Sequence, residues 1–165
     1  MSRLATLAGT VFGIGYLRPA PGSWGALAAL PMAWGLHAAG GFPSLLLATA
    51  AVFILGLWAI TDMTEGAADH DPSEIVIDEV AGQFIALFPL SYAAWARDIE
   101  ITAMWPGWIA AFVLFRLFDI LKPGPVGWAD RRRDPMGVML DDAIAGALAA
   151  LGVVALGALA HGVLM

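Results

Sequence analysis

The longest uncharged stretch of the chain constrains the fold most, because residues 20–61 contain no Asp, Glu, Lys or Arg. These 42 residues are long enough for two membrane-crossing helices of about 20 residues each. The sequence Gly-Gly-Phe-Pro at 40–43 interrupts the stretch and predicts a turn between helices over 23–39 and 44–61. The chain is 60% hydrophobic and only 13% charged, against about 25% charged in an average soluble domain, so we expect lipid to be its solvent.

Three further apolar runs follow, at 80–96, at 101–115 and at 143–165, and the second continues as a helix to about residue 121. Charged segments separate them. The sequence therefore predicts an all-α fold, a polytopic transmembrane helical bundle of about five spans, in a single membrane-embedded domain across all 165 residues. The short, glycine-interrupted apolar segment 4–17 is expected to be re-entrant or interfacial, with an additional short span as the alternative.

The basic residues indicate how the spans are oriented, because cytoplasmic loops carry an excess of Lys and Arg. With five spans, Arg97 falls on one side, and the other seven bases fall on the side of the N-terminus: Arg3, Arg18, Arg116, Lys122, Arg131, Arg132 and Arg133. That side is predicted to be cytoplasmic, with Met165 on the opposite side. Twelve of the 14 acids also fall there, and the net charge of −6 argues against a nucleic-acid partner.

Pairs of acids beside apolar helices mark candidate functional positions, since a charge in the hydrocarbon costs about 3 kcal/mol on insertion scales. Asp78 and Glu79 stand at the start of the third predicted span. Adjacent helical residues diverge by about 100°, so we expect one to bind a metal and the other to orient a ligand. The alternative is that both only favour the positive end of the helix dipole. Asp141 and Asp142 are predicted to open the last span, with Gly146 one turn later allowing close helix contact.

Two groups of basic and polar residues are candidates for holding an anion. Arg116 and Asp119 are spaced to share a helix face, and Lys122 follows one turn later. The alternative for Arg116 is a side chain that extends to the membrane surface and pairs with Asp119. In a turn with four Gly and two Pro, Arg18 is a further cation and Ser23 is expected to cap the next helix, whose amide end suits a phosphate. A plain loop with Arg18 as an orientation signal is the alternative there.

Together these segments place carboxylates, cations and a glycine-rich turn at one membrane depth. The chain has no Cys, and hard oxygen ligands favour Mg²⁺ over zinc. Cations beside a carboxylate-bound Mg²⁺ are what a phosphate requires as charge builds up in the transition state. A phospholipid headgroup is therefore the expected substrate, and membrane lipids are the expected surroundings.

Four stretches of the sequence together resemble the phosphatidylglycerophosphatase A family of bacterial membrane phosphatases. They occur in the order and spacing of the family, across nearly the whole chain, at 15–25 (GYLRPAPGSWG), 75–82 (IVIDEVAG), 115–125 (FRLFDILKPGP) and 137–146 (GVMLDDAIAG). The resemblance implies a Mg²⁺-dependent enzyme of phospholipid synthesis in the bacterial inner membrane. Such an enzyme hydrolyses phosphatidylglycerophosphate to phosphatidylglycerol, here with its active site facing the cytoplasm.

The resemblance also suggests roles for the candidate residues in a direct hydrolysis. Mg²⁺ would be held by a subset of Glu79, Asp119, Asp141 and Asp142. Asp78 would act as general base or support the metal ligands, completing a catalytic set of five acids. The phosphate would be bound by Arg18, Ser23, Arg116 and Lys122. An ion- or proton-coupled transporter is the alternative function, since carboxylates in membranes also build ion pathways, and a non-catalytic subunit of a membrane complex is a third.

Overall fold

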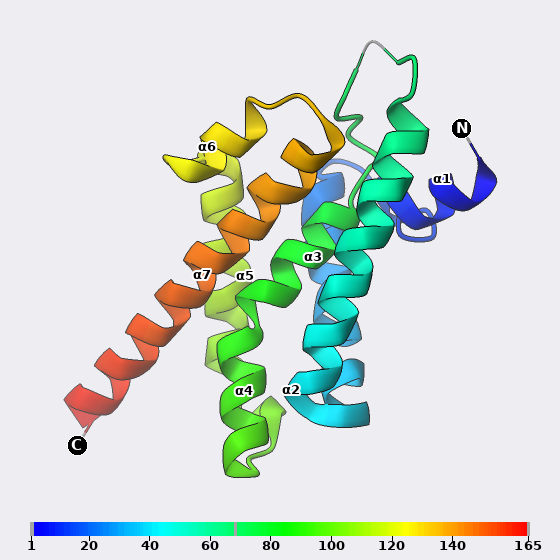
Figure 1. Cartoon of the computed structure of the whole chain (residues 1–165). Coiled ribbons are helices and arrows are strands. Elements are labelled where there is room, and N and C mark those ends of the chain that lie inside the picture. Colours follow the sequence, from blue (N-terminus) through cyan, green and yellow to red (C-terminus); the bar gives the residue numbers. More distant parts are fainter. Residues whose placement is uncertain (1, 68, 165) are drawn as a thin grey trace.

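The computed structural model describes residues 2–67 and 69–164, and the side chains of these residues up to 160. Within this part the chain is helical and contains no strand. Figure 1 shows a bundle in which most long helices run between two ends, with α7 diverging from the others toward the C-terminus. The prediction of an all-α membrane protein is confirmed, whereas Met165, predicted to lie on the far side of the membrane, is outside the described residues.

The long uncharged stretch forms α2 (Pro21–Thr64), which consists of two helices. Gly40 and Gly41 leave helical geometry, and Gly41 has φ +66°, which favours glycine. The chain reverses direction there, so the two halves of α2 form a hairpin (Figure 1). The predicted turn is confirmed.

The run predicted as one helix over 80–96 is two helices, so that prediction was wrong in detail. α3 (Ile77–Ala86) and α4 (Phe88–Arg97) meet at Leu87. Pro89 is the reason, because its ring lacks an N–H and collides with the carbonyl four residues earlier. The chain changes direction between these two short helices, and α3 crosses the middle of the bundle (Figure 1).

The fourth predicted helix ends where the sequence indicated. After the short helix η2 (Ile101–Met104), α5 (Trp105–Leu121) stops at Lys122, which adopts a left-handed conformation directly before a proline. A further helix, α6 (Pro125–Asp130), forms within the charged segment between the last two predicted spans.

The last helix begins earlier than predicted. α7 (Pro135–Leu164) starts eight residues before the expected position 143. Pro135 suits a first helical turn, and the Asp134 carboxylate accepts a hydrogen bond from the Gly137 amide (2.6 Å), as a helix-capping residue does. Asp141 and Asp142 therefore lie about two turns inside the helix rather than at its opening.

The N-terminal segment supports the chain that leads into α3. α1 (Arg3–Gly9) has seven residues, or about 10 Å, and is too short to cross a bilayer. The Val76 amide donates to the Gly9 carbonyl (2.9 Å). Within the short helix η1 (Ile14–Tyr16), Gly15 lies so close to the Glu74 carbonyl that any side chain would overlap it. These contacts fix the position from which α3 starts.

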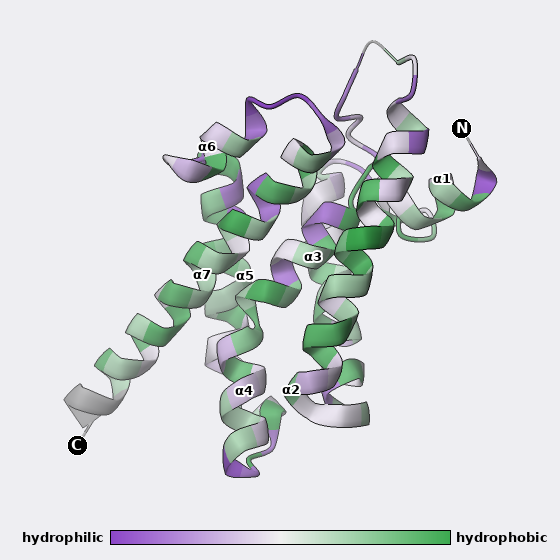
Figure 2. Cartoon of the chain, in the orientation of Figure 1, coloured by the Kyte–Doolittle hydropathy of each residue, from purple (hydrophilic) through white to green (hydrophobic). Residues whose placement is uncertain are grey.

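Among the described residues, three helices are long and apolar enough to cross a membrane: Pro21–Thr64, which contains the hairpin, Ile101–Leu121 and Pro135–Ala160. The pair α3 and α4 is not among them, because the break at Leu87 leaves two helices of ten residues each. The count of five spans stays a prediction. Figure 2 shows hydrophobic residues along the helices and hydrophilic ones gathered mainly in the loops at the α6 end of the bundle.

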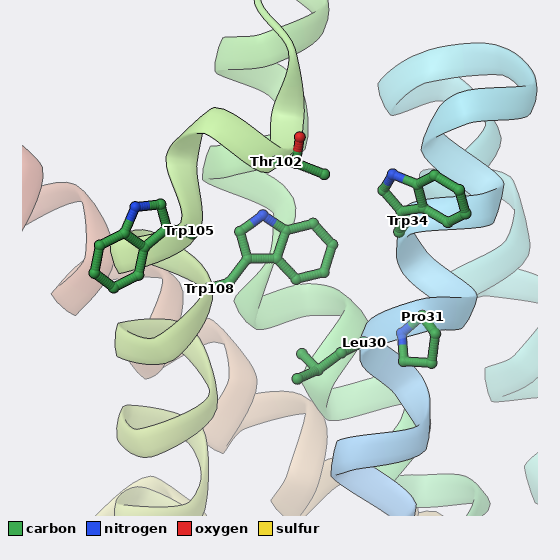
Figure 3. Close-up of a pocket in the computed structure, with 6 residues that line it drawn as sticks. All are labelled: Leu30, Pro31, Trp34, Thr102, Trp105 and Trp108. Carbon is green, nitrogen blue, oxygen red and sulfur yellow. The ribbon is translucent and has the colours of Figure 1, made fainter.

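Tryptophans mark both ends of the bundle, as expected at membrane interfaces. Trp34 of α2 and Trp108 of α5 face each other across an apolar pocket of about 350 Å³, with Trp105 beside it (Figure 3). Trp24, near the start of α2, and Trp128 of α6 are exposed at the other end.

Three helices meet where α3 crosses α7. A side chain on Gly146 would overlap the Gly82 carbonyl oxygen, so the two backbones are in contact there. The fully buried Phe115 ring of α5 covers the crossing, since a Cβ on Gly82 would meet it at 2.5 Å. Glycine is therefore required at both positions by close approach, as in other tightly packed membrane helices.

We expect Gly146→Ala to lower the free energy of unfolding by about 1–3 kcal/mol, because the added methyl group meets backbone that cannot give way. Thermal unfolding in detergent would measure this. Gly35→Ala is the matched control, since a Cβ at Gly35 meets nothing within 4 Å. Equal unfolding temperatures for the two variants would contradict the proposed crossing.

Candidate active site

A polar cavity lies at one end of the bundle. Figure 2 shows the hydrophilic loops gathered mainly at that end. The volume of the cavity is about 320 Å³. It is formed by the start of α2, the loop before α3, and one end each of α3, α5 and α7. The lining residues are Ala20, Pro21, Gly22, Asp71, Ser73, Ile75, Asp78, Glu79, Arg116, Asp119, Lys122, Asp141 and Asp142. Seven of the nine residues predicted from the sequence are in this set; Arg18 and Ser23 are not.

Three carboxylates in the cavity converge from three helices. Glu79 of α3, Asp119 of α5 and Asp142 of α7 each present an oxygen, and these oxygens lie within 4.8 Å of one another. Glu79 and Asp142 are buried, at 8% and 3% exposure. Such a set of hard oxygen donors, without Cys or His, suits Mg²⁺. The predicted metal ligands Glu79, Asp119 and Asp142 are thus together, and Asp141 is not part of this group.

The position of these carboxylates follows from the helix crossing. Glu79 lies one turn before Gly82, and Asp142 one turn before Gly146, so the backbone contact brings their side chains together. On α5, which runs the opposite way, Asp119 lies one turn after Phe115. Each helix therefore contributes an acid one turn from the crossing, on the side of the cavity.

Arg116 lies among these acids. Its guanidinium forms an ion pair with Glu79 and another with Asp119 (2.9 Å to Oδ2), and its side chain is only 15% exposed. The pairing with Asp119 was foreseen by the helical spacing, but the one with Glu79 crosses from α5 to α3. Arg116 Nε is buried without a hydrogen-bond partner in the described structure. An arginine that merely reached the membrane surface would not be so enclosed.

Lys122 occupies the rim of the cavity between two acids. Its Nζ lies 2.6 Å from Asp130 Oδ1 and 2.5 Å from Asp141 Oδ2. Burial alone would lower the pKa of Lys122, but the hydrogen bonds to Asp130 and Asp141 outweigh it and raise that pKa above its usual range. Lys122 is therefore a permanent cation. Asp141 is directed toward it and also accepts the Asp142 amide (3.0 Å).

Asp78 lines the cavity apart from the group of three. It is 7% exposed, and its Oδ1 has no hydrogen-bond partner in the described structure. The two adjacent acids of α3 thus differ as the helical geometry predicted: Glu79 joins Asp119 and Asp142, and Asp78 does not. An unpartnered carboxylate oxygen at a polar cavity is free to accept a proton or a hydrogen bond from a ligand.

The glycine-rich turn contributes Ala20, Pro21 and Gly22 to the cavity lining, rather than the predicted Arg18 and Ser23. Ser23 is not a cap, because Pro21 begins α2 two residues earlier and no side chain caps that end. Gly22 lies against Glu79 and Arg116, where a side chain would overlap the Glu79 carboxylate. Arg18 is exposed and lies outside the cavity. Its Nη1 donates a hydrogen bond to Ser73 Oγ (3.1 Å), and Ser73 is one of the residues that line the cavity.

Sequence reasoning missed Asp71, Ser73 and Asp130, which line or border the cavity. Asp71 and Ser73 lie in an acidic loop with no recognisable spacing. Asp130 reaches Lys122 only because α6 folds the chain back. The cavity lining has six carboxylates but two cations, Arg116 and Lys122. This excess of negative charge would repel a phosphate unless a further cation entered, and the oxygens of Glu79, Asp119 and Asp142 suit such a cation.

Comparison with known proteins was consistent with these observations. The family model for phosphatidylglycerophosphatase A matches residues 7–157. The chain is 37% identical over 147 residues to a phosphatidylglycerophosphatase A of Haemophilus influenzae (88% of this chain, 83% of the relative). It is 33% identical over 141 residues to that of Escherichia coli K12 (84% and 75%). A putative phosphatidylinositol-3-phosphatase of Bacteroides thetaiotaomicron is 38% identical over 150 residues (88% of each). No solved structure matches the chain.

Proposed function

The chain belongs to the phosphatidylglycerophosphatase A family of phosphoric monoester hydrolases, and we propose that it converts phosphatidylglycerophosphate to phosphatidylglycerol with the aid of Mg²⁺. The observation that carries this proposal is the convergence of Glu79, Asp119 and Asp142 beside Arg116 in one cavity. A transporter is less well supported, because the acids gather at one end of the helices and the relatives are named as phosphatases.

The residues of the cavity fit Mg²⁺, and Glu79, Asp119 and Asp142 would hold it. The ion would supply charge neutralisation and electron withdrawal at the phosphate. The Arg116 guanidinium, beside Glu79 and Asp119, would bind two phosphate oxygens at once, which its planar shape favours.

The remaining groups divide the other tasks of hydrolysis. Lys122, held between Asp130 and Asp141, adds a fixed positive charge at the rim where a headgroup enters. Asp78 has an unpartnered oxygen at the cavity and would orient the attacking water and accept its proton. Gly22 leaves room for the phosphate beside Glu79, because no side chain projects there.

The substrate enters from the lipid, so the cavity belongs at a membrane surface. The excess of basic residues at this end supports a cytoplasmic orientation in the bacterial inner membrane. The relatives carry two substrate names, one with a glycerophosphate and one with an inositol phosphate headgroup. A lipid phosphomonoester is common to both, and we favour phosphatidylglycerophosphate because two of the three relatives are named for it.

Purified protein in detergent should release inorganic phosphate from phosphatidylglycerophosphate when Mg²⁺ is present, and chelation with EDTA should abolish the release. Phosphatidylinositol-3-phosphate, assayed in parallel, should be hydrolysed more slowly. Faster hydrolysis of the inositol lipid would reassign the substrate. Full activity in EDTA would refute the metal requirement.

Asp142→Asn should reduce turnover by at least about 10²-fold, since it removes one charged donor from the group of three. The protein should still accumulate in the membrane, because the substitution preserves size. Asp98→Asn is the matched control. Asp98 is exposed at the far end, after α4, in a left-handed conformation that Asn also tolerates. Near-normal activity of Asp142→Asn would remove that residue from the site.

Arg116→Lys should lower kcat by about 10²-fold, because Lys keeps the charge but loses the planar fork. Lys122→Arg should be milder, since it keeps a cation between two acids. Both variants are to be compared at saturating Mg²⁺ and equal expression. If both retained near-normal rates, Arg116 would have only a packing role.

A further inference from the structure

A basic turn joins α6 to α7 and consists of Arg131, Arg132 and Arg133, all exposed. The acids on either side are already engaged. Asp130 is bound by Lys122 at 2.6 Å, and Asp134 is bound by Arg132 at 3.0 Å. Within the described residues, neither Arg131 nor Arg133 forms an ion pair. The turn therefore carries two positive charges that the protein does not neutralise.

An exposed tryptophan lies next to this basic turn. Trp128 of α6 is 54% exposed, and the Arg132 guanidinium carbon lies 5.9 Å from the centre of its ring. The opposite face of α6 is fixed, because Val126 and Ala129 are fully buried. Trp and Arg side by side are characteristic of the level at which lipid headgroups meet the hydrocarbon.

The basic turn also lies beside the candidate active site. Lys122 lines the cavity and binds Asp130, the residue directly before Arg131. Figure 1 shows α6 at the same end of the bundle as the start of α7, and Figure 2 shows the connection between them as one of the most hydrophilic segments. A headgroup held at the turn would thus be a neighbour of the cavity rim.

We propose that the basic turn, together with Trp128, binds the phosphate groups of anionic lipids in the surrounding bilayer. Arginine suits this partner because its fork pairs with two phosphate oxygens. Each basic residue near an anionic lipid surface strengthens association roughly fivefold. Zwitterionic headgroups have no net charge and gain much less. The binding concerns the lipid surroundings of the enzyme and holds whether or not the hydrolytic assignment is correct.

Quenching of tryptophan fluorescence by brominated lipids tests this directly. The protein is reconstituted with brominated phosphatidylglycerol or brominated phosphatidylcholine, and the signal of Trp128 is obtained as the difference from Trp128→Phe. At low salt, the anionic lipid should be favoured at Trp128 by at least about fivefold. Equal quenching by the two lipids would overturn the proposal.

The variant Arg131→Gln/Arg133→Gln should lose this preference. The control Arg3→Gln/Arg97→Gln removes two exposed arginines elsewhere and should keep it. A preference retained in the first variant would exclude the basic turn as its source. If that variant does not accumulate, the lipid preference of the unaltered protein is measured at low and at high salt instead. Charge screening should reduce the preference several-fold between low and high salt, and a salt-independent preference would count against the proposal.

Discussion

The contact between the backbones of α3 and α7 is the constraint on which the rest of the structure depends. Gly82 and Gly146 allow it, and Phe115 seals it from the side of α5. Because an acid lies one turn from each of these residues, the crossing determines that Glu79, Asp119 and Asp142 converge. Packing in the apolar part of the bundle thus determines the geometry of the polar part. If the two helices crossed at a greater distance, the three carboxylates would be separated and the cavity would lose its shape.

Convergence of acids at a membrane boundary has an electrostatic cost, and the fold offsets it with two cations. Arg116 binds two of the acids in the group, and Lys122 binds Asp130 and Asp141 at the rim. The compensation is incomplete, since six carboxylates line the cavity. The same charge excess would be relieved by the divalent cation proposed for this site, which would then allow a phosphate to bind. Stability and ligand preference therefore have a common origin in this charge excess.

The connection between α6 and α7 at the same end has the opposite character. Uncompensated arginines and an exposed tryptophan on the α6–α7 connection adjoin a cavity rich in acids. An anionic lipid headgroup approaching past this connection would meet positive charge before it reached the acidic interior. Lys122 links the two regions, because it lines the cavity and binds the residue before the basic turn. In this arrangement the basic turn would attract an anionic headgroup, and the residues of the cavity would act on its phosphate.

The sequence by itself determined the helical membrane fold, the hairpin at Gly40 and Gly41, the end of α5 and seven of the residues that line the cavity. Those features depend on local rules: the length of an apolar run, the residues that break helices, and the high cost of a charged acid next to lipid, which marks it as functional. The break at Leu87 and the early start of α7 have local signals, in Pro89 and in Asp134 with Pro135, that the prediction did not use. Only the tertiary structure decided which acids face one another. Asp141 and Asp142 are neighbours in sequence, yet one meets Lys122 and the other Glu79 and Asp119. Helix periodicity separates adjacent side chains, but the partner of each is set by how the helices cross, and no local pattern records that.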